Sequence, residues 1–111
     1  MRQNWKARIT GCLALLMIAA TLVVPARSDD KSAATYKQKC VACHGADGKG
    51  DTPTGKALGI HSFASAEVAK MSDQELADII DKGKGKMPKY GSSMKPDEIK
   101  AMVAYIRTLG K

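Results

Sequence analysis

The stretch Cys40-Val41-Ala42-Cys43-His44 decides more about this 111-residue chain than any other part of its sequence. Two thiols three positions apart, followed directly by an imidazole, form the C-x-x-C-H signature of covalent c-type haem attachment. The spacing suits the chemistry, because each thiol can form a thioether to one edge of the same porphyrin while the histidine binds the iron. The motif therefore predicts one haem c, attached through Cys40 and Cys43 and ligated by His44.

Other uses of a C-x-x-C pair fit the rest of the chain less well. A thioredoxin-like redox site requires a βαβ context, and the sequence contains no convincing strand run to supply it. A zinc site would have to recruit His44 and His61, whose separation is much longer than the usual spacing of paired histidine ligands. His61 lies in a loop without a supporting signal, and we expect it to be exposed rather than bound to a metal.

Residues 1–28 have the pattern of a secretory signal peptide. A basic start precedes an almost wholly apolar run over 13–24, and Val24-Pro25-Ala26 supplies the small-residue pattern of a cleavage site. We expect cleavage after Ala26 or Ser28, export to the periplasm or another extracytoplasmic compartment, and one functional domain over 29–111. An uncleaved anchor is the alternative, although the apolar run is shorter than the ~20 residues that a spanning helix prefers.

Processing also lowers the charge. The whole chain has 18 Lys and Arg against 11 Asp and Glu, and loss of four basic residues with the signal peptide leaves 14, or a net charge of +3. No basic stripe with interleaved aromatic residues remains, so nucleic-acid binding is not expected. The remaining 83 residues contain no cysteine beyond Cys40 and Cys43. Without a disulfide, a domain of this size needs a bound apolar cofactor for much of its core.

The part of the chain after the signal has the pattern of helices joined by glycine-rich loops. Tyr36 and the two cysteines recur at three- and four-residue steps, which predicts a helix over 32–43. The glycines that follow predict a long loop, and 65–71 is a candidate short helix. Ser72, with a glutamate three residues later, forms a capping-box pair ahead of a helix that ends at Gly83.

The last helix is the clearest of the predicted elements. Pro96 marks its start, acidic residues occupy its first turn, and Gly110 ends it. One face carries a continuous apolar stripe of Ile99, Met102, Val103, Ile106 and Leu109. We therefore expect an all-α fold of three to four helices with loops wrapped around one covalently attached haem.

A closed haem iron needs a second axial ligand, and the candidates are Met71, Met87, Met94, Met102 and His61. Met102 belongs to the apolar stripe of the last helix, and Met71 and Met94 each precede a helix whose first turn they can staple. Met87 has no such explanation. It lies in an extended glycine-lysine loop, where Pro88 stiffens the backbone and a thioether can point inward.

These features together resemble the small bacterial class I monohaem cytochromes c. The resemblance covers 32–109 and rests on the early C-x-x-C-H motif, the Gly-Lys-Met-Pro loop at 85–88, and the final helix with Ala104-Tyr105-Ile106. It implies that His44 is the proximal ligand of the iron and Met87 the distal one.

The resemblance also implies supporting roles for residues around the haem. The carbonyl oxygen of Pro53 would accept a hydrogen bond from the Nδ1–H of His44, unless Pro53 only shapes a turn. Tyr36 and Tyr105 would pack where the first and last helices cross. Tyr90 would shield the haem, reach a propionate, or serve as a purely hydrophobic contact.

The function implied by the resemblance is that of a soluble, monomeric electron carrier rather than an enzyme. Four lysines without an intervening acid flank the Met87 loop, which favours redox partners with acidic docking patches, although a solvated loop without a partner is an open alternative. These lysines are Lys82, Lys84, Lys86 and Lys89. Other functions left open are a small-ligand sensor or peroxidatic protein with a labile Met87, and a subunit of a larger oxidase or dehydrogenase.

Overall fold

A computed structural model describes residues 27–111, and within this range the chain is helical and contains no strand. The predicted all-α fold is confirmed. The helices, in chain order, are α1 (Arg27–Lys39), α2 (Val41–His44), α3 (Pro53–Leu58), α4 (Ala66–Lys70), α5 (Asp73–Lys82) and α6 (Pro96–Leu109). None of these helices is long and apolar enough to cross a membrane.

The predicted signal peptide, residues 1–28, lies almost entirely outside the described residues. Its presence and its cleavage after Ala26 or Ser28 stay predictions.

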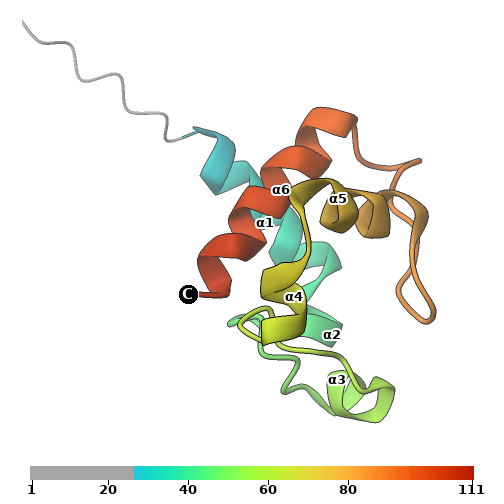
Figure 1. Ribbon diagram of the computed structural model, residues 1–111. Helices are drawn as coiled ribbons and strands as arrows, with labels where there is room; N and C mark the ends of the chain where they lie inside the picture. The colour runs from blue at the N-terminus through green and yellow to red at the C-terminus, as the bar shows by residue number, and fades with distance from the viewer. Residues whose placement is uncertain (1–26) are drawn as a thin grey trace, which may run out of the picture.

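Helices α1 and α6, the first and last long helices, cross and pack against each other (Figure 1). Tyr36 of α1 and Tyr105 of α6 meet at this crossing, with ring centroids 5.4 Å apart and ring planes inclined by 57°. This inclined geometry is favourable for aromatic pairs. The predicted packing role of the two tyrosines is confirmed.

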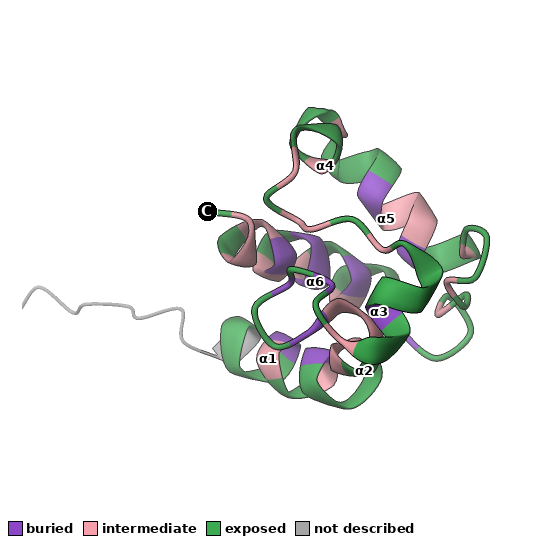
Figure 2. Cartoon of the chain, turned by 90° about the horizontal axis from the view of Figure 1, so that it is seen from below, coloured by how far each residue is buried: buried purple, intermediate pink, exposed green. Residues whose placement is uncertain are grey.

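The core lies between α1, α5 and α6, whose buried residues face one another (Figure 2). Helix α5 begins with the predicted capping box, in which Ser72 accepts from the Glu75 N–H and the Glu75 carboxylate accepts from the Ser72 N–H. Helix α6 supplies half of the buried apolar residues, because its stripe recurs at helical spacing. The buried apolar set is Tyr36, Leu76, Ile80, Met94, Ile99, Met102, Val103 and Ile106.

The stretch after the C-x-x-C-H motif differs from the prediction, because part of the expected loop is the helix α3. Thr52 caps this helix by accepting the Gly55 N–H at 2.8 Å, and Pro53 occupies the first turn. A Cβ atom at Gly55 would stand 2.4 Å from the Cys43 carbonyl oxygen. Gly55 therefore does not break a helix here; it allows α3 to lie directly against α2.

The predicted first helix is also interrupted. Helix α1 ends at Lys39, and Cys40 is the N-cap of the separate four-residue helix α2. The spacing of the apolar positions could not reveal this break, because Cys40 and Cys43 keep helical spacing across it.

The hydroxyl of Tyr36 provides a test of how the motif is held. It donates to the Gly45 carbonyl oxygen at 2.6 Å, in a buried position, and the Gly48 N–H reaches the same oxygen at 3.2 Å. Tyr36→Phe removes the shorter bond only, so the free energy of unfolding should fall by about 1 kcal/mol. Denaturant unfolding of the haem-loaded protein measures this loss. Tyr105→Phe is the control and should change stability by less than about 0.5 kcal/mol; equal losses in both variants would contradict the assignment.

Candidate functional site

The C-x-x-C-H residues lie where α1 gives way to α2. The Cys40 carbonyl oxygen accepts the His44 N–H at 2.9 Å, which closes the turn that brings the motif together. Tyr36 ties the following residue, Gly45, back to α1. Cys40 and Cys43 are both half-buried free thiols that border the same crevice.

Packing against an aromatic ring holds the imidazole of His44, whereas hydrogen bonds hold its backbone. Its Nδ1 atom is buried and has no hydrogen-bond partner among the described residues. The Phe63 ring stacks on the imidazole at a centroid distance of 4.8 Å and an interplanar angle of 23°. Burial lowers the pKa of His44, which favours the neutral imidazole that binds metals.

The predicted hydrogen bond from His44 Nδ1–H to the Pro53 carbonyl oxygen is absent from the structure, and that prediction is corrected here. Pro53 stands in the first turn of α3, where a carbonyl points along its own helix axis toward the next turn. A different hydrogen bond joins the motif to the start of α3. The Thr52 hydroxyl donates to the Cys43 carbonyl oxygen at 3.0 Å. Pro53 shapes the start of α3, which was the alternative interpretation from the sequence.

An apolar cavity of about 460 Å³ opens beside His44. Helices α4, α5 and α6 supply one part of its wall, and α1, α2 and the loops supply the rest. Its size lies in the range of about 300–1,000 Å³ that is typical of cofactor pockets. A smaller crevice of about 200 Å³ adjoins it, and both are bordered by Cys40 and His44. Every ligand candidate from the sequence borders the larger cavity, namely Met71, Met87, Met94, Met102 and His61.

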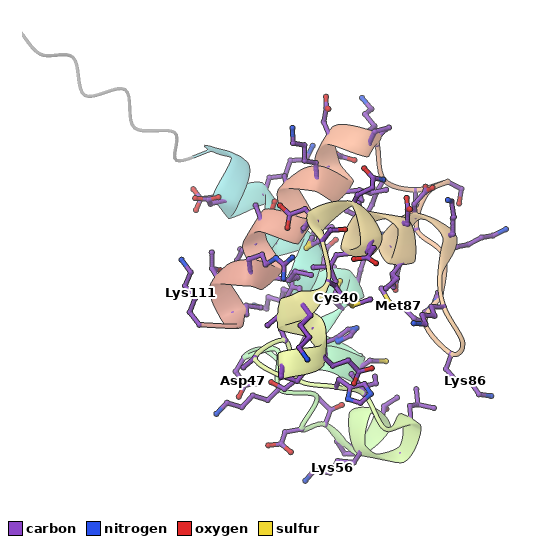
Figure 3. All side chains as sticks on the ribbon, in the orientation of Figure 1. Cys40, Asp47, Lys56, Lys86, Met87 and Lys111 are labelled. Carbon is purple, nitrogen blue, oxygen red and sulfur yellow. The ribbon has the colours of Figure 1, made fainter. Side chains whose placement is uncertain are left out.

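Met87 stands apart from the other methionines of the described residues because it alone borders both hollows. It ends a tight turn in which its N–H donates to the Lys84 carbonyl oxygen at 2.9 Å, and the Lys84 N–H donates back at 3.2 Å. In Figure 3, Met87 lies close to Cys40, while Lys86 projects outward from the same turn. By contrast, Met94 and Met102 are buried in the core.

Tyr90 links the Met87 loop to the cysteine motif. Its hydroxyl donates to the Lys39 carbonyl oxygen at 3.1 Å, immediately before Cys40, and the Lys39 ammonium lies 5.9 Å from the ring centroid. The ring borders both the cavity and the crevice. The hydroxyl is thus occupied by a backbone partner, and the roles predicted for Tyr90 at the haem stay predictions.

His61 is exposed, as expected from the sequence, and its Nδ1 atom lies 3.4 Å from a Glu67 carboxylate oxygen at the rim of the cavity. In the part of the chain that the structure describes, no three His, Cys, Asp or Glu side chains gather closely enough to hold a bare metal ion. The zinc ligand set of two cysteines with His44 and His61 is therefore not assembled.

The lysines around the Met87 turn divide into two groups. Lys84 and Lys86 border the crevice, and Lys39, which the sequence analysis did not single out, borders it from the α1 side. Lys82 instead lies 3.9 Å from Asp78. Lys56, in α3, is exposed and lies 3.7 Å from Asp51. The basic rim of the crevice is therefore formed by Lys39, Lys84 and Lys86, and the exposed Leu58 and Pro88 also border it.

Besides Lys39, sequence reasoning missed Phe63 and Arg107. Phe63 is the sole phenylalanine of the chain, and its place in a polar glycine- and serine-rich loop was a signal that it packs on something specific. Arg107 reaches from α6 to the backbone beside Met71. No local pattern predicts such a contact, because it joins segments that meet only in the folded chain.

Comparison with known proteins places these features in a family. The sequence pattern of the family described as cytochrome c oxidase, cbb3-type, subunit III matches residues 27–106. The cbb3-type cytochrome c oxidase subunit FixP of Bradyrhizobium diazoefficiens is 35% identical over 79 residues, which are 68% of this chain and 25% of that protein. The chain thus spans about a quarter of the length of this curated relative.

Solved structures agree with the sequence match. The KustC0563 c-type cytochrome superimposes with a TM-score of 0.66 at 36% identity, covering 72% of this chain and 98% of that one. A tyrosine-to-phenylalanine mutant of the same cytochrome gives a TM-score of 0.64 at 35% identity, covering 70% and 96%.

The stacking of Phe63 on His44 leads to a prediction about the imidazole. Phe63→Leu keeps an apolar side chain but removes the flat ring, so the orientation of the imidazole should become less uniform. The free energy of unfolding should fall by about 1 kcal/mol, and the electron paramagnetic resonance signal of the oxidised haem-loaded protein should broaden. Phe63→Tyr retains the ring and should leave the signal unchanged. A sharp wild-type signal in Phe63→Leu would refute the restraint.

Proposed function

We propose that this chain, which belongs to the c-type cytochrome family of cbb3-type oxidase subunit III domains, carries single electrons between redox partners outside the cytoplasm. Domains of this family bind one covalently attached haem c and act outside the cytoplasm. We further propose that a signal peptide at 1–28 directs the chain to the periplasm.

In the proposed site, Cys40 and Cys43 form the two thioether links, and His44 and Met87 are the axial ligands. The donor set suits a haem iron, since a neutral imidazole and a thioether are the ligand pair of high-potential c-type haems. The observation that carries the proposal is that His44 and Met87, from opposite halves of the chain, border one apolar cavity together with Cys40.

A bound haem c supplies an iron that accepts and returns one electron. The protein contributes the surroundings that make this transfer fast and reversible. Apolar side chains of α5 and α6 line the cavity and exclude water, and the low local dielectric favours the less charged, reduced state. With two axial side chains assigned to the iron, no substrate position is required, and we propose no enzymatic turnover for the domain itself.

A second candidate, membership of an oxidase assembly, is favoured by the match to FixP, an oxidase subunit of which this chain resembles about a quarter. In both candidates the haem transfers electrons, and they differ only in whether the partner is transient or permanent. Co-purification of the tagged chain with a membrane-bound oxidase would favour the second candidate.

The basic rim of Lys39, Lys84 and Lys86 supports the proposed choice of partner. These ammonium groups surround the crevice that Met87, Leu58 and Pro88 border. A ring of positive charge around an apolar centre suits a redox partner with an acidic rim, because complementary charges accelerate encounter without creating a permanent complex. We therefore propose a short-lived contact at this face and a monomeric carrier.

The distal assignment is tested with Met87→Ala. Cys40 and Cys43 are unchanged, so the covalent haem should still form. The far-red band of methionine-ligated ferric haem should disappear and the reduction potential should fall, since the thioether favours ferrous iron. The matched control is Met71→Ala, which removes another cavity methionine and should keep the band. A band that survives in Met87→Ala, or that is lost in Met71→Ala, would refute the assignment.

The docking proposal is tested with the double variant Lys84→Gln/Lys86→Gln. The rate at which anionic ferricyanide oxidises the reduced protein should fall by up to about tenfold at low salt, and the difference should vanish at high salt. A cationic cobalt complex should show the opposite change. The control is Lys100→Gln/Lys111→Gln, which removes the same charge away from the crevice; Lys111 and Lys86 lie on opposite sides in Figure 3. Equal effects in both double variants would contradict docking at the rim.

A further inference from the structure

Arg107, in the last turn of α6, makes several hydrogen bonds to the stretch of chain from the end of α4 to the start of α5. Its Nη2 atom donates to the Met71 carbonyl oxygen at 2.5 Å, and Nη1 donates to the Val68 carbonyl oxygen at 3.3 Å. The same guanidinium donates to one carboxylate oxygen of Asp73 from Nε at 3.1 Å and from Nη2 at 3.0 Å. One side chain thus binds three residues, Val68, Met71 and Asp73, within a stretch of six.

The carbonyl groups that Arg107 binds belong to the end of α4. Met71 is the C-cap of this helix, and Val68 lies in its last turn. The Val68 carbonyl oxygen also accepts the Met71 N–H, at 3.1 Å. The last carbonyls of a helix carry partial negative charge and are not fully satisfied within it, so a cation from elsewhere stabilises them. Arg107 therefore caps α4 from a different helix.

Besides Arg107, helix α4 is held by the Ser65 cap at its start, by the pairing of Glu67 with His61, and by the packing of Val68 against the core. It has five residues and none of them is buried. The helix pairs that pack closely in the described part of the chain are α1 with α6, α5 with α6, α2 with α3, and α1 with α2, and α4 belongs to none of them. A helix this short is not stable by itself, so its position depends on contacts such as those of Arg107.

The residues fixed by Arg107 also form part of the cavity wall. The side chains of Val68 and Met71 border the large cavity beside Leu76 and Ile106. Movement of this wall would admit water next to the bound group or would bring the Met71 thioether to a different place in the cavity. Arg107 itself does not border that cavity.

We propose that Arg107 is a positioning residue that fixes the Val68–Met71 wall of the haem cavity and thereby keeps the reduction potential high. The inference rests on the proposed haem site, but the contact it describes belongs to the polypeptide. The planar guanidinium suits the task because it donates in several fixed directions at once, whereas a lysine ammonium in the same place would act as a single mobile charge.

Two simpler roles for Arg107 must be separated from this one. Arg107 could stabilise the whole fold, in which case all helices would respond alike to its loss. It could also act on the haem only through its positive charge, in which case a lysine would replace it fully. Its charge is partly offset by Asp73, whose carboxylate is 79% exposed.

The experiment compares Arg107→Gln and Arg107→Lys with the control Lys100→Gln in the haem-loaded full chain. Lys100→Gln removes one positive charge from the same helix without touching α4. Amide hydrogen exchange over residues 66–73 should become about tenfold faster in both Arg107 variants, the order expected for losing one or two net hydrogen bonds. Exchange within α1 should not change, and the reduction potential should fall in both variants but not in the control.

Several results would overturn the proposal. They are a wild-type potential in Arg107→Lys, an equal rise of exchange in all helices, or an equal fall of potential in Lys100→Gln. If Arg107→Gln does not fold, Arg107→Lys, which keeps the charge, decides the question alone. Failure of the proposed haem site is distinguishable, because it would appear as absence of covalent haem in the wild-type chain, whereas local exchange at 66–73 reports the Arg107 contact in any folded form.

Discussion

The structure depends on one cavity that its own side chains do not fill. Protein interiors are normally packed without voids much larger than a water molecule, whereas about 460 Å³ lies open between α5, α6 and the C-x-x-C-H motif. Leu76, Ile80 and Ile106, which are themselves buried, line this space with apolar surface, so an apolar group bound there would complete the packing around them. A covalent haem c would meet this requirement. The described part of the chain is small and both of its cysteines are free thiols, so it has few other sources of core.

Three side chains fasten separate segments around that cavity, and each does so by donating to a backbone carbonyl. Tyr36 binds Gly45 beyond the motif, Tyr90 binds Lys39 before it, and Arg107 binds Met71 at the end of α4. Such bonds hold loops and short helices that lack enough apolar surface to be held by burial. Hydrogen bonds therefore hold in place the segments that surround the cavity, while the side chains that face into it are mostly apolar.

Close backbone approach is the second requirement of the site. Gly55 lets α3 lie against α2, and Gly83 has a φ of 75° and would place a Cβ atom 2.7 Å from the Met87 carbonyl oxygen. Any side chain at Gly83 would therefore push the Met87 turn outward. The glycines that look from the sequence like simple loop residues here determine how near the two proposed iron ligands come to the cavity.

The sequence by itself determined the chemistry and the long elements. Spacing within a motif or along a helix is local. The C-x-x-C-H motif, the capping box at Ser72 and the apolar stripe of α6 can therefore be recognised from the sequence alone. Met87 stood out because no helical pattern accounted for an apolar residue there. The tertiary structure alone decided what depends on segments meeting. It placed Phe63 against His44, replaced the Pro53 hydrogen bond by one from Thr52, formed α3 around Gly55, and brought Arg107 to α4. These contacts join residues far apart in the chain, and their geometry is fixed only when the helices pack.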